Sequence, residues 1–310
     1  MLFELTILGC SSAVPVYGRS LTAQVLNIKN RLFLIDCGEG TQFQLMKYKI
    51  SYNKIQKIFI SHLHGDHVYG LPGLINTMNL SDRQKPLKVY GPVGIKTMLD
   101  FIFELSGRNE FGFDLEIIEL PVDKHLKIFE DKELKVYAFP LIHSLPTIGY
   151  RFEEKNILKN IKPDAILKYN LNYEQIKAAK RGEDIIMDSG ETIKNSSVTF
   201  IAKKPRSYAY CSDTRYSEKY IPYVKNVDLL YHESTYIHEM KEKAQNRFHS
   251  TNVEAALVAK KANAGKLILG HYSSRYKDLT PMLEEARTVF ANTDLALDGK
   301  RFEVKTDEDE

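Results

Sequence analysis

Short runs of β-branched, aromatic and aliphatic residues recur along much of the chain, and most of them are followed by a turn signal. Apolar runs of this kind, bounded by turn-forming residues, are typical of β-strands. The pattern predicts strands over residues 3–9, 23–28, 31–38, 57–62, 87–91, 134–143, 197–202, 207–213, 229–234 and 266–271.

Three longer stretches, 93–107, 250–265 and 279–292, carry apolar residues at the spacing of a helix. The second stretch has Ser250 or Thr251 as its predicted N-cap and closes at Gly265. Strands come first along the chain, and strands and helices then alternate. This order predicts an α/β protein in which helices cover β-sheets.

Residues 151–194 differ from their surroundings, because they are rich in lysine and glutamate and poor in strand signals. A weak helical pattern lies around 172–182. The segment is either a protruding insertion or a surface helix with loops. Composition alone favours the second interpretation.

The composition is that of a globular protein, with 43% hydrophobic and 27% charged residues among 310. The net charge of +3 permits an anionic partner but does not require one. Cys10, Cys37 and Cys211 are far apart, which argues against a disulfide framework and a thiolate zinc site and favours a reducing compartment. Neither a signal peptide nor an apolar run of ~18 residues is visible, so we expect a cytoplasmic protein without a membrane partner.

The densest chemical signal is SHLHGDH at residues 61–67, which follows a predicted strand. It places His62, His64, Asp66 and His67 within six consecutive positions. In an extended chain His62 and His64 face the same side and can grip one ion, while the two residues beyond Gly65 can point to a second position. So many costly polar groups in one turn indicate a metal site.

Three more candidate ligands, His143, Asp213 and His271, each follow a different predicted strand. A single histidine in such a place is more often structural, and Asp213 before Thr214 can also form an Asx-turn or a helix cap. However, functional groups collect beyond the carboxyl ends of strands in open α/β sheets. We therefore expect these residues to converge on the histidine-rich loop.

Together these residues offer seven candidate ligands, which exceeds one tetrahedral ion and suits two ions that share a carboxylate. Imidazole and carboxylate groups suit zinc, and they also suit Mn²⁺ or Fe²⁺ as substitutes. Paired ions of this kind activate water and clamp a phosphoryl group. The residues alone therefore predict hydrolase-like metal chemistry.

H-x-H-x-D-H after a strand, with His, Asp and His at later strand ends, resembles the metallo-β-lactamase superfamily. Nearly the whole chain resembles the ribonuclease Z family more specifically, through LGCSSAVPVYGRS, FLIDCGEGTQFQL, SHLHGDHVYGLPGL, KPLKVYGPVGIK, YCSDTRY, HEST, FHST and LGHYSSRY in family order. The resemblance implies a four-layer αββα fold, with two β-sheets sandwiched between helices. Residues 1–310 would form one catalytic domain, and 151–194 would be a protruding tRNA-binding arm.

The resemblance also assigns each candidate ligand to one of two Zn²⁺ ions per subunit. It gives His62, His64 and His143 to one ion, Asp66, His67 and His271 to the other, and Asp213 to both as a bridge.

Four further roles follow from the same resemblance. Asp66 would accept a proton from the attacking water. His249 of FHST would protonate the departing 3′ oxygen while Glu233 of HEST holds its ring, although His249 can also simply start the following helix. Asp36 would orient a ligand histidine, or would be only a turn former beside Gly38.

The implied reaction removes the 3′ trailer of precursor tRNA next to the discriminator base, leaving a 3′-hydroxyl on the tRNA and a 5′-phosphate on the trailer. The family commonly forms homodimers in which the arm of one subunit presents the substrate to its partner. HEST, FHST and the arm-length insertion favour this substrate over small phosphodiesters, thioesters or β-lactams. A non-catalytic nucleic-acid-binding protein with structural zinc, or a scaffolding protein, would leave much of the ligand set unexplained.

The chain departs from the family pattern in two places. Ser212 stands where the family usually has glycine before the aspartate, and the ligand itself is expected to remain in place. The arm segment lacks the usual Gly-Pro-rich tip but keeps basic residues, which are Lys168, Lys177, Lys180 and Arg181. Lysines on a projecting element can contact phosphates without reading base sequence.

Overall fold

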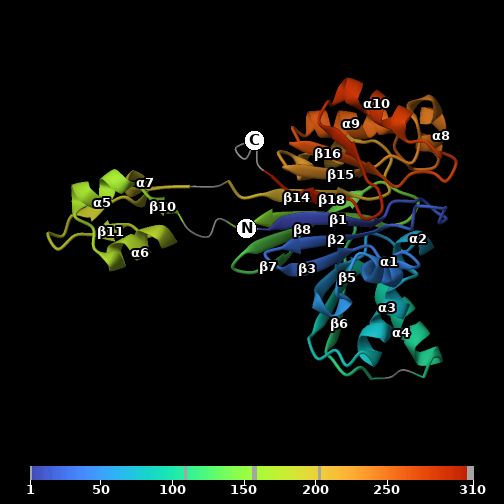
Figure 1. The fold of residues 1–310 in the computed structure, drawn as a ribbon, viewed down its shortest axis with the longest axis horizontal. Coiled ribbons are helices and arrows are strands. Elements are labelled where there is room, and N and C mark those ends of the chain that lie inside the picture. The colour runs from blue at the N-terminus through green and yellow to red at the C-terminus, as the bar shows by residue number, and fades with distance from the viewer. Residues whose placement is uncertain (1, 108–109, 156–158, 202–203, 306–310) are drawn as a thin grey trace.

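The computed structural model describes residues 2–107, 110–155, 159–201 and 204–305. Two seven-stranded β-sheets stack face to face, and helices cover the outer side of each sheet (Figure 1). The predicted α/β fold with four αββα layers is therefore confirmed. A smaller group of helices and short strands lies apart from these layers.

The first sheet is mixed, with antiparallel pairing from β18 through β3 and parallel pairing from β3 through β6. In spatial order its strands are β18 (Arg301–Glu303), β1 (Phe3–Gly9), β2 (Ala23–Ile28), β3 (Arg31–Ile35), β4 (Ile55–Phe59), β5 (Leu87–Pro92) and β6 (Leu115–Leu120).

The second sheet pairs its strands in parallel from β17 through β14 and antiparallel from β14 through β7. In spatial order its strands are β17 (Thr293–Leu295), β16 (Lys266–Gly270), β15 (Leu229–Glu233), β14 (Ser207–Cys211), β9 (Thr147–Glu154), β8 (Leu134–Leu141) and β7 (Leu126–Glu130).

Alternation along the strands separates two apolar cores. In β3, Phe33 and Ile35 belong to the core between the sheets, whereas Leu32 and Leu34 face the helices on the other side. This is the period of two expected when both faces of a strand are covered. The ring centroids of Phe59 in β4 and Phe152 in β9 are 5.2 Å apart, so these two side chains pack across the interface between the sheets.

Helices on both outer faces complete the four layers (Figure 1). The helices on the side of the first sheet are α1 (Thr41–Lys47), α2 (Gly65–Val68), α3 (Leu71–Leu80) and α4 (Ile95–Leu105), and those on the side of the second are α8 (Lys241–Asn246), α9 (Asn252–Lys261) and α10 (Thr280–Val289). Helix α9 begins at Thr251, whose side chain forms a reciprocal capping box with Glu254. This confirms one of the two predicted N-caps.

The carboxyl ends of β3, β4, β8, β14, β15 and β16 all lie at one edge of the sandwich, because these strands run in a common direction within their sheets. Close packing at this edge requires glycine. A Cβ added to Gly38, just after β3, would lie 2.4 Å from the carbonyl oxygen of Asp66. The loops after β3 and β4 therefore pack against each other through bare backbone.

The separate group of elements lies between Asn160 and Phe200. It has its own small core, to which Ala165, Leu171, Ala179 and Ile185 contribute. Its elements are β10 (Asn160–Ile161), α5 (Pro163–Tyr169), α6 (Tyr173–Arg181), β11 (Ile185–Ile186), β12 (Thr192–Ile193), α7 (Asn195–Val198) and β13 (Thr199–Phe200). We call this group the 160–200 module.

The structure differs from the predicted elements in several places. Residues 151–154 continue β9 instead of starting the insertion, and the predicted strand 197–202 contains the end of α7 and the two-residue β13, with residue 202 outside the described residues. Strands β6, β7 and β9 and helices α1 and α3 had not been predicted. In the part of the chain that the structure describes, no helix combines the length and apolarity needed to cross a membrane. All three cysteines are buried free thiols, as expected.

Candidate metal centre

The loop after β4 brings four predicted ligands to the common edge of the sheets. The chain leaves β4 through Ser61 and enters α2, so that His62 lies before the helix and Asp66 and His67 lie inside it. Nε2 of His62 and Nδ1 of His64 are 3.0 Å apart. The two histidines therefore face a common point, as their spacing predicts.

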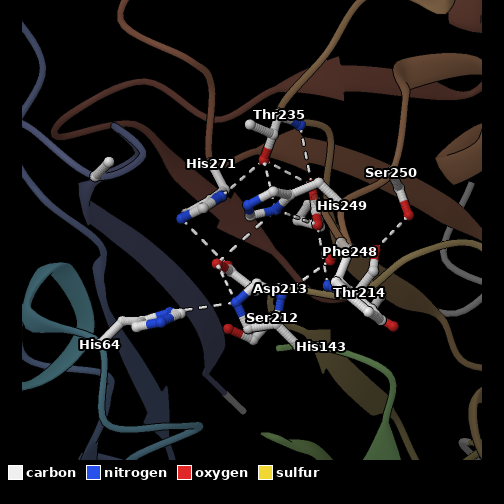
Figure 2. A network of polar contacts seen from close by, with 12 residues as sticks. His64, His143, Ser212, Asp213, Thr214, Thr235, Phe248, His249, Ser250 and His271 are labelled. Atoms are coloured by element: carbon white, nitrogen blue, oxygen red, sulfur yellow. Dashed lines mark hydrogen bonds and ion pairs between the residues drawn. The ribbon is translucent and has the colours of Figure 1, made fainter. Parts of the chain in front are cut away.

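The other three predicted ligands arrive from the second sheet. His143 follows β8, Asp213 follows β14 and His271 follows β16. Figure 2 shows the three side chains converging on one region, and only 2–4% of each is exposed. The structure thus brings together residues that are up to about two hundred positions apart in the sequence.

Two main groups of candidate ligand atoms result, beside a third that includes His249, and within each group the atoms lie within 4.8 Å of one another. The main groups are His62, His64, His143 and Asp213, and Asp66, His67 and His271. The histidines and Asp66 divide as the family resemblance implies, whereas Asp213 appears in the first group and not in the second. The coordination of metal by these residues remains a prediction.

Asp213 lies between the two groups. Its Oδ1 is 3.2 Å from Nε2 of His271 and 3.3 Å from Nε2 of His67. Its Oδ2 is 3.6 Å from Nε2 of His143 and 3.7 Å from Nε2 of His62. One carboxylate therefore reaches nitrogens of both groups, which is the geometry that a bridging ligand needs.

Hydrogen bonds behind the site fix two of the histidine rings. Nδ1 of His67 donates to Oδ2 of Asp36 at 2.7 Å, so Asp36 lies where the sequence predicts an orienting carboxylate. Nδ1 of His143 donates to the carbonyl oxygen of Phe248 at 2.9 Å. Asp36 and Phe248 both have positive φ, a backbone conformation that is uncommon outside glycine. Each ring is left with Nε2 facing the other ligands.

The donor set fits divalent cations. Nε2 of His67 and Nε2 of His271 are 3.1 Å apart, although the Nδ1 atoms of both rings already donate elsewhere. Among the described residues, Oδ1 of Asp213 is buried without a hydrogen-bond partner. Facing lone pairs beside a buried carboxylate oxygen are costly unless cations lie among them.

The carboxylates of the site favour a cation among the rings. Burial would lower the pKa of His67, but Asp213, Asp66 and Asp36 raise it well above its usual value, so its Nε2 holds a proton unless a metal ion takes that place. Burial lowers the pKa of His62, and the neighbouring His67 lowers it further, which favours a neutral ring with a free lone pair. Burial alone would raise the pKa of Asp66, but the charge of His67 and the contact with Nε2 of His271 hold it well below its usual value. Asp66 is therefore an ionised carboxylate at neutral pH.

His249 and Glu233 form a pair beside the ligands (Figure 2 shows His249). Nδ1 of His249 donates to Oε1 of the buried Glu233 at 2.8 Å. Burial would lower the pKa of His249, but the charge and hydrogen bond of Glu233 raise it to about 9. Atoms of Asp213, His249 and His271 also lie within 4.8 Å of one another, so a third ligand grouping is possible on distance alone. However, the His249 nitrogen near Asp213 is the one that donates to Glu233, which favours a proton donor over a ligand.

Two further residues that contact this site, Thr235 and Ala13, were not named by the sequence analysis. The hydroxyl of Thr235, in HEST, lies 2.9 Å from Nδ1 of His271 and donates to Oε2 of Glu233 at 2.7 Å. The backbone N–H of Ala13 donates to Oδ2 of Asp66 at 2.7 Å. Thr235 lies in a motif that the sequence analysis used, whereas no residue type marks a backbone donor.

The cluster opens to solvent through a cavity of about 580 Å³. Its polar lining includes His64, Asp66, Asp213 and His249, and Tyr69 and Val14 contribute apolar surface. The cavity therefore gives a substrate access to both groups of ligands.

Comparison with known proteins identifies the family. "Ribonuclease Z" from Porphyromonas gingivalis (strain ATCC BAA-308 / W83) is 41% identical over 302 residues, which cover 97% of this chain and 99% of that protein. The chain belongs to the ribonuclease Z family. The crystal structure of human tRNase Z, short form (ELAC1), also matches, with a TM-score of 0.71 and 28% identity over 98% of this chain and 100% of that chain.

Two further similarities are more limited. The metallo-beta-lactamase fold protein YhfI from Bacillus subtilis matches with a TM-score of 0.68 and 19% identity over 98% of this chain and 100% of that chain, which shows the fold alone. A family model described as Anti-Pycsar protein Apyc1 matches residues 3–108. That match includes the histidine-rich loop but stops before His143, Asp213 and His271. Ribonuclease Z similarity, by contrast, spans the complete candidate site.

Proposed function

We propose that this member of the ribonuclease Z family is an endoribonuclease that removes the 3′ trailer of precursor tRNA. It hydrolyses one phosphodiester next to the discriminator base, leaving a 3′-hydroxyl on the tRNA and a 5′-phosphate on the trailer. The observation that carries the proposal is the convergence of two ligand groups on Asp213 at the base of an open cavity. The family membership directs this chemistry to tRNA.

We propose two Zn²⁺ ions per subunit, with Mn²⁺ or Fe²⁺ as possible substitutes. One ion would be held by His62, His64 and His143, the other by Asp66, His67 and His271, and both by Asp213. When bound, such ions supply Lewis-acid activation of water and of the phosphoryl oxygens. The chain itself holds the rings in place through the hydrogen bonds to their other nitrogens.

Two side chains would move protons. Asp66 is ionised and lines the cavity, so it would accept a proton from the attacking water. His249 lines the same cavity, and its Nδ1 is occupied by Glu233. Its Nε2 would then pass a proton to the departing 3′ oxygen of the tRNA. Glu233 would act by holding the ring, since it is buried behind His249.

Metal removal tests the proposed chemistry. Dialysis against a chelator is expected to abolish cleavage of a 3′-extended precursor tRNA, and added Zn²⁺ is expected to restore it. An Asp66→Ala variant purified in parallel should stay inactive in both states, which excludes a contaminating nuclease. Tight binding of the RNA without metal-dependent cleavage would instead support a binding protein with structural zinc. Turnover confined to small phosphodiesters or thioesters would support another hydrolase.

We further propose that the 160–200 module is the tRNA-binding arm of a homodimer. Lys168 and Lys177 are exposed on its helices, and each ammonium group lies near a tyrosine ring, at 5.0 Å and 5.9 Å respectively. Figure 1 shows the module at the far end of the sandwich from α2, the helix that contains Asp66. This separation supports a dimer in which RNA held by one subunit enters the site of its partner.

Replacing Lys168, Lys177 and Lys180 together by alanine should raise KM for precursor tRNA and leave kcat nearly unchanged. The slope of log affinity against log salt should fall by about one per lysine that contacts a phosphate. Alanine at the exposed Lys85, Lys96 and Lys124, which lie outside the module, is the matched control. Equal effects from both triple variants would contradict a specific role of the module.

Mixing subunits tests presentation between partners. The triple lysine variant of the module has an intact site, and Asp66→Ala has an intact module. After dissociation and reassociation, a mixture of the two should cleave faster than either variant alone when precursor tRNA is well below the KM of the lysine variant. A mixture of Asp66→Ala with Asp213→Asn should recover nothing, because neither subunit has a working site. Activity that stays at the level of the separate lysine variant would contradict presentation between subunits.

A further inference from the structure

A buried group of hydrogen-bonding side chains lies directly behind the ligand histidines. Each of its members is at most 1% exposed, and they come from the ends of β3, β4 and β14. They are Asp36, Ser61, Tyr210 and Ser212. We call this group the hydroxyl cluster.

Asp36 is the acceptor of the hydroxyl cluster. Its Oδ2 receives hydrogen bonds from the hydroxyl of Tyr210 at 2.6 Å, from Nδ1 of His67 at 2.7 Å and from the hydroxyl of Ser61 at 2.8 Å. Its Oδ1 accepts the backbone N–H of Ser61 at 2.7 Å. A carboxylate is the strongest acceptor available in this region, so it determines the direction of the surrounding hydrogen bonds.

Proton counting then assigns the bonds of Ser61. Its hydroxyl has one proton, which goes to Asp36, and two lone pairs, which can only accept. Nδ1 of His62 lies 3.0 Å from this oxygen and must therefore carry a hydrogen. The hydroxyl of Ser212, at 2.9 Å, must donate as well. Nδ1 of His67 is also 3.5 Å from the Ser61 oxygen, but its hydrogen goes to Asp36 at 2.7 Å. Ser61 therefore bonds to His62 directly and to His67 through Asp36.

We infer that Ser212 is a positioning residue. It acts through Ser61 to hold the rings of His62 and His67 with their Nε2 atoms facing the other ligands. By donating to Ser61, the Ser212 hydroxyl polarises Ser61 as a donor to Asp36 and disfavours the reversed bond from Ser61 to Nδ1 of His62. The reversed bond would place the ring proton of His62 on Nε2, the nitrogen that faces the other ligands. This inference rests on the proposed metal site and assigns a role to the serine that replaces the family's glycine.

Metal affinity measured without RNA tests the inference. Zn²⁺ dissociation constants would come from competition with a chromophoric chelator, and absorption spectra of the Co²⁺-loaded protein would report ligand geometry. Ser61→Ala, which removes the direct partner of His62, should weaken affinity ~10- to 100-fold. Ser212→Ala should weaken it about 2- to 12-fold, the equivalent of one lost net hydrogen bond, and should alter the Co²⁺ spectrum. Ser212→Thr keeps the hydroxyl and should restore both properties.

Coupling between the serines is the most specific expectation. The double variant Ser61→Ala with Ser212→Ala should bind Zn²⁺ no more weakly than Ser61→Ala alone, because Ser212 acts through Ser61. Ser207→Ala, which removes a buried hydroxyl at the other end of β14, is the matched control and should leave affinity unchanged.

Three outcomes would overturn the inference. The first is that the effects of the two serine variants on Zn²⁺ affinity are fully additive. The second is that Ser212→Ala leaves Zn²⁺ affinity and the Co²⁺ spectrum unchanged and only lowers the Tm of the metal-free chain. The third is that the wild-type chain binds no Zn²⁺. If the affinities follow the expected pattern while precursor tRNA is not cleaved, the proposed substrate fails and the role of Ser212 stands.

Discussion

Asp213→Asn is expected to reduce both metal content and cleavage more strongly than any other single substitution. Its carboxylate oxygens lie 3.2–3.7 Å from histidine nitrogens of both ligand groups, so the substitution weakens both positions at once. Loss of an outer partner of a ligand typically costs ~10- to 100-fold, and loss of this shared ligand should cost more than ~100-fold. Metal content by mass spectrometry and cleavage rate at saturating Zn²⁺ measure the two effects.

Asp228→Asn is the matched control for Asp213→Asn, because Asp228 is another buried carboxylate, directly before β15, and binds Ser207 away from the site. It should lower Tm without changing metal content. If Asp213→Asn retained full metal content and near-normal cleavage, Asp213 would not be the bridge between the two ligand groups.

His249→Ala is expected to separate turnover from metal binding. The ring donates to Glu233 and borders the cavity, and it is not needed for either of the two main ligand groups. Metal content should therefore remain as in the wild-type chain, while kcat falls by ~10²- to 10⁴-fold, the usual contribution of acid–base catalysis. Glu233→Gln should also lower kcat, because the ring of His249 then loses its charged partner.

His238→Ala provides the matched control, since His238 belongs to the same part of the chain but bonds to Thr251. It should leave kcat and metal content unchanged. If His249→Ala instead lost one metal equivalent, His249 would belong to the third ligand grouping with Asp213 and His271.

The candidate ligands were accessible from the sequence because a simple rule applies to them. Polar groups that directly follow β-rich runs meet at one sheet edge when those strands run in the same direction. His143 and His271 illustrate this rule, since neither is informative alone and both lie beside Asp213 in the structure. Spacing within the histidine-rich loop separates His62 and His64 from the two ligands beyond Gly65. The family resemblance then supplied the assignment of His143, Asp213 and His271, which strand periodicity does not contain.

The supporting contacts were not accessible in the same way. The acceptor for His143 is the backbone carbonyl of Phe248, and every residue has such a group, so the sequence carries no signal for it. The partners of Ser61 depend on which side chains the second sheet brings opposite it, as Ser212 shows. These contacts are set by the packing of two sheets and not by local pattern.

The 160–200 module shows a second limit of sequence patterns. Its core is small and its helices are short, so its apolar periodicity is weak and composition resembles that of an ordinary surface segment. The capping box of Asn172 with Gln175 marks the start of α6, where the weak helical pattern had been noted. These elements assemble around their own core through contacts between residues tens of positions apart. A local sequence pattern does not reveal such contacts.

Mapping the products of one cleavage reaction tests the central claim most directly. A 3′-extended precursor tRNA, labelled at its 5′ end or at its 3′ end, would be incubated with the Zn²⁺-loaded chain and with Asp66→Ala. The wild-type chain is predicted to produce one cut next to the discriminator base, with a 3′-hydroxyl on the tRNA and a 5′-phosphate on the trailer, and the variant is predicted to produce none. Stepwise shortening from the 3′ end, cuts at scattered positions, or equal cleavage by Asp66→Ala would contradict the account.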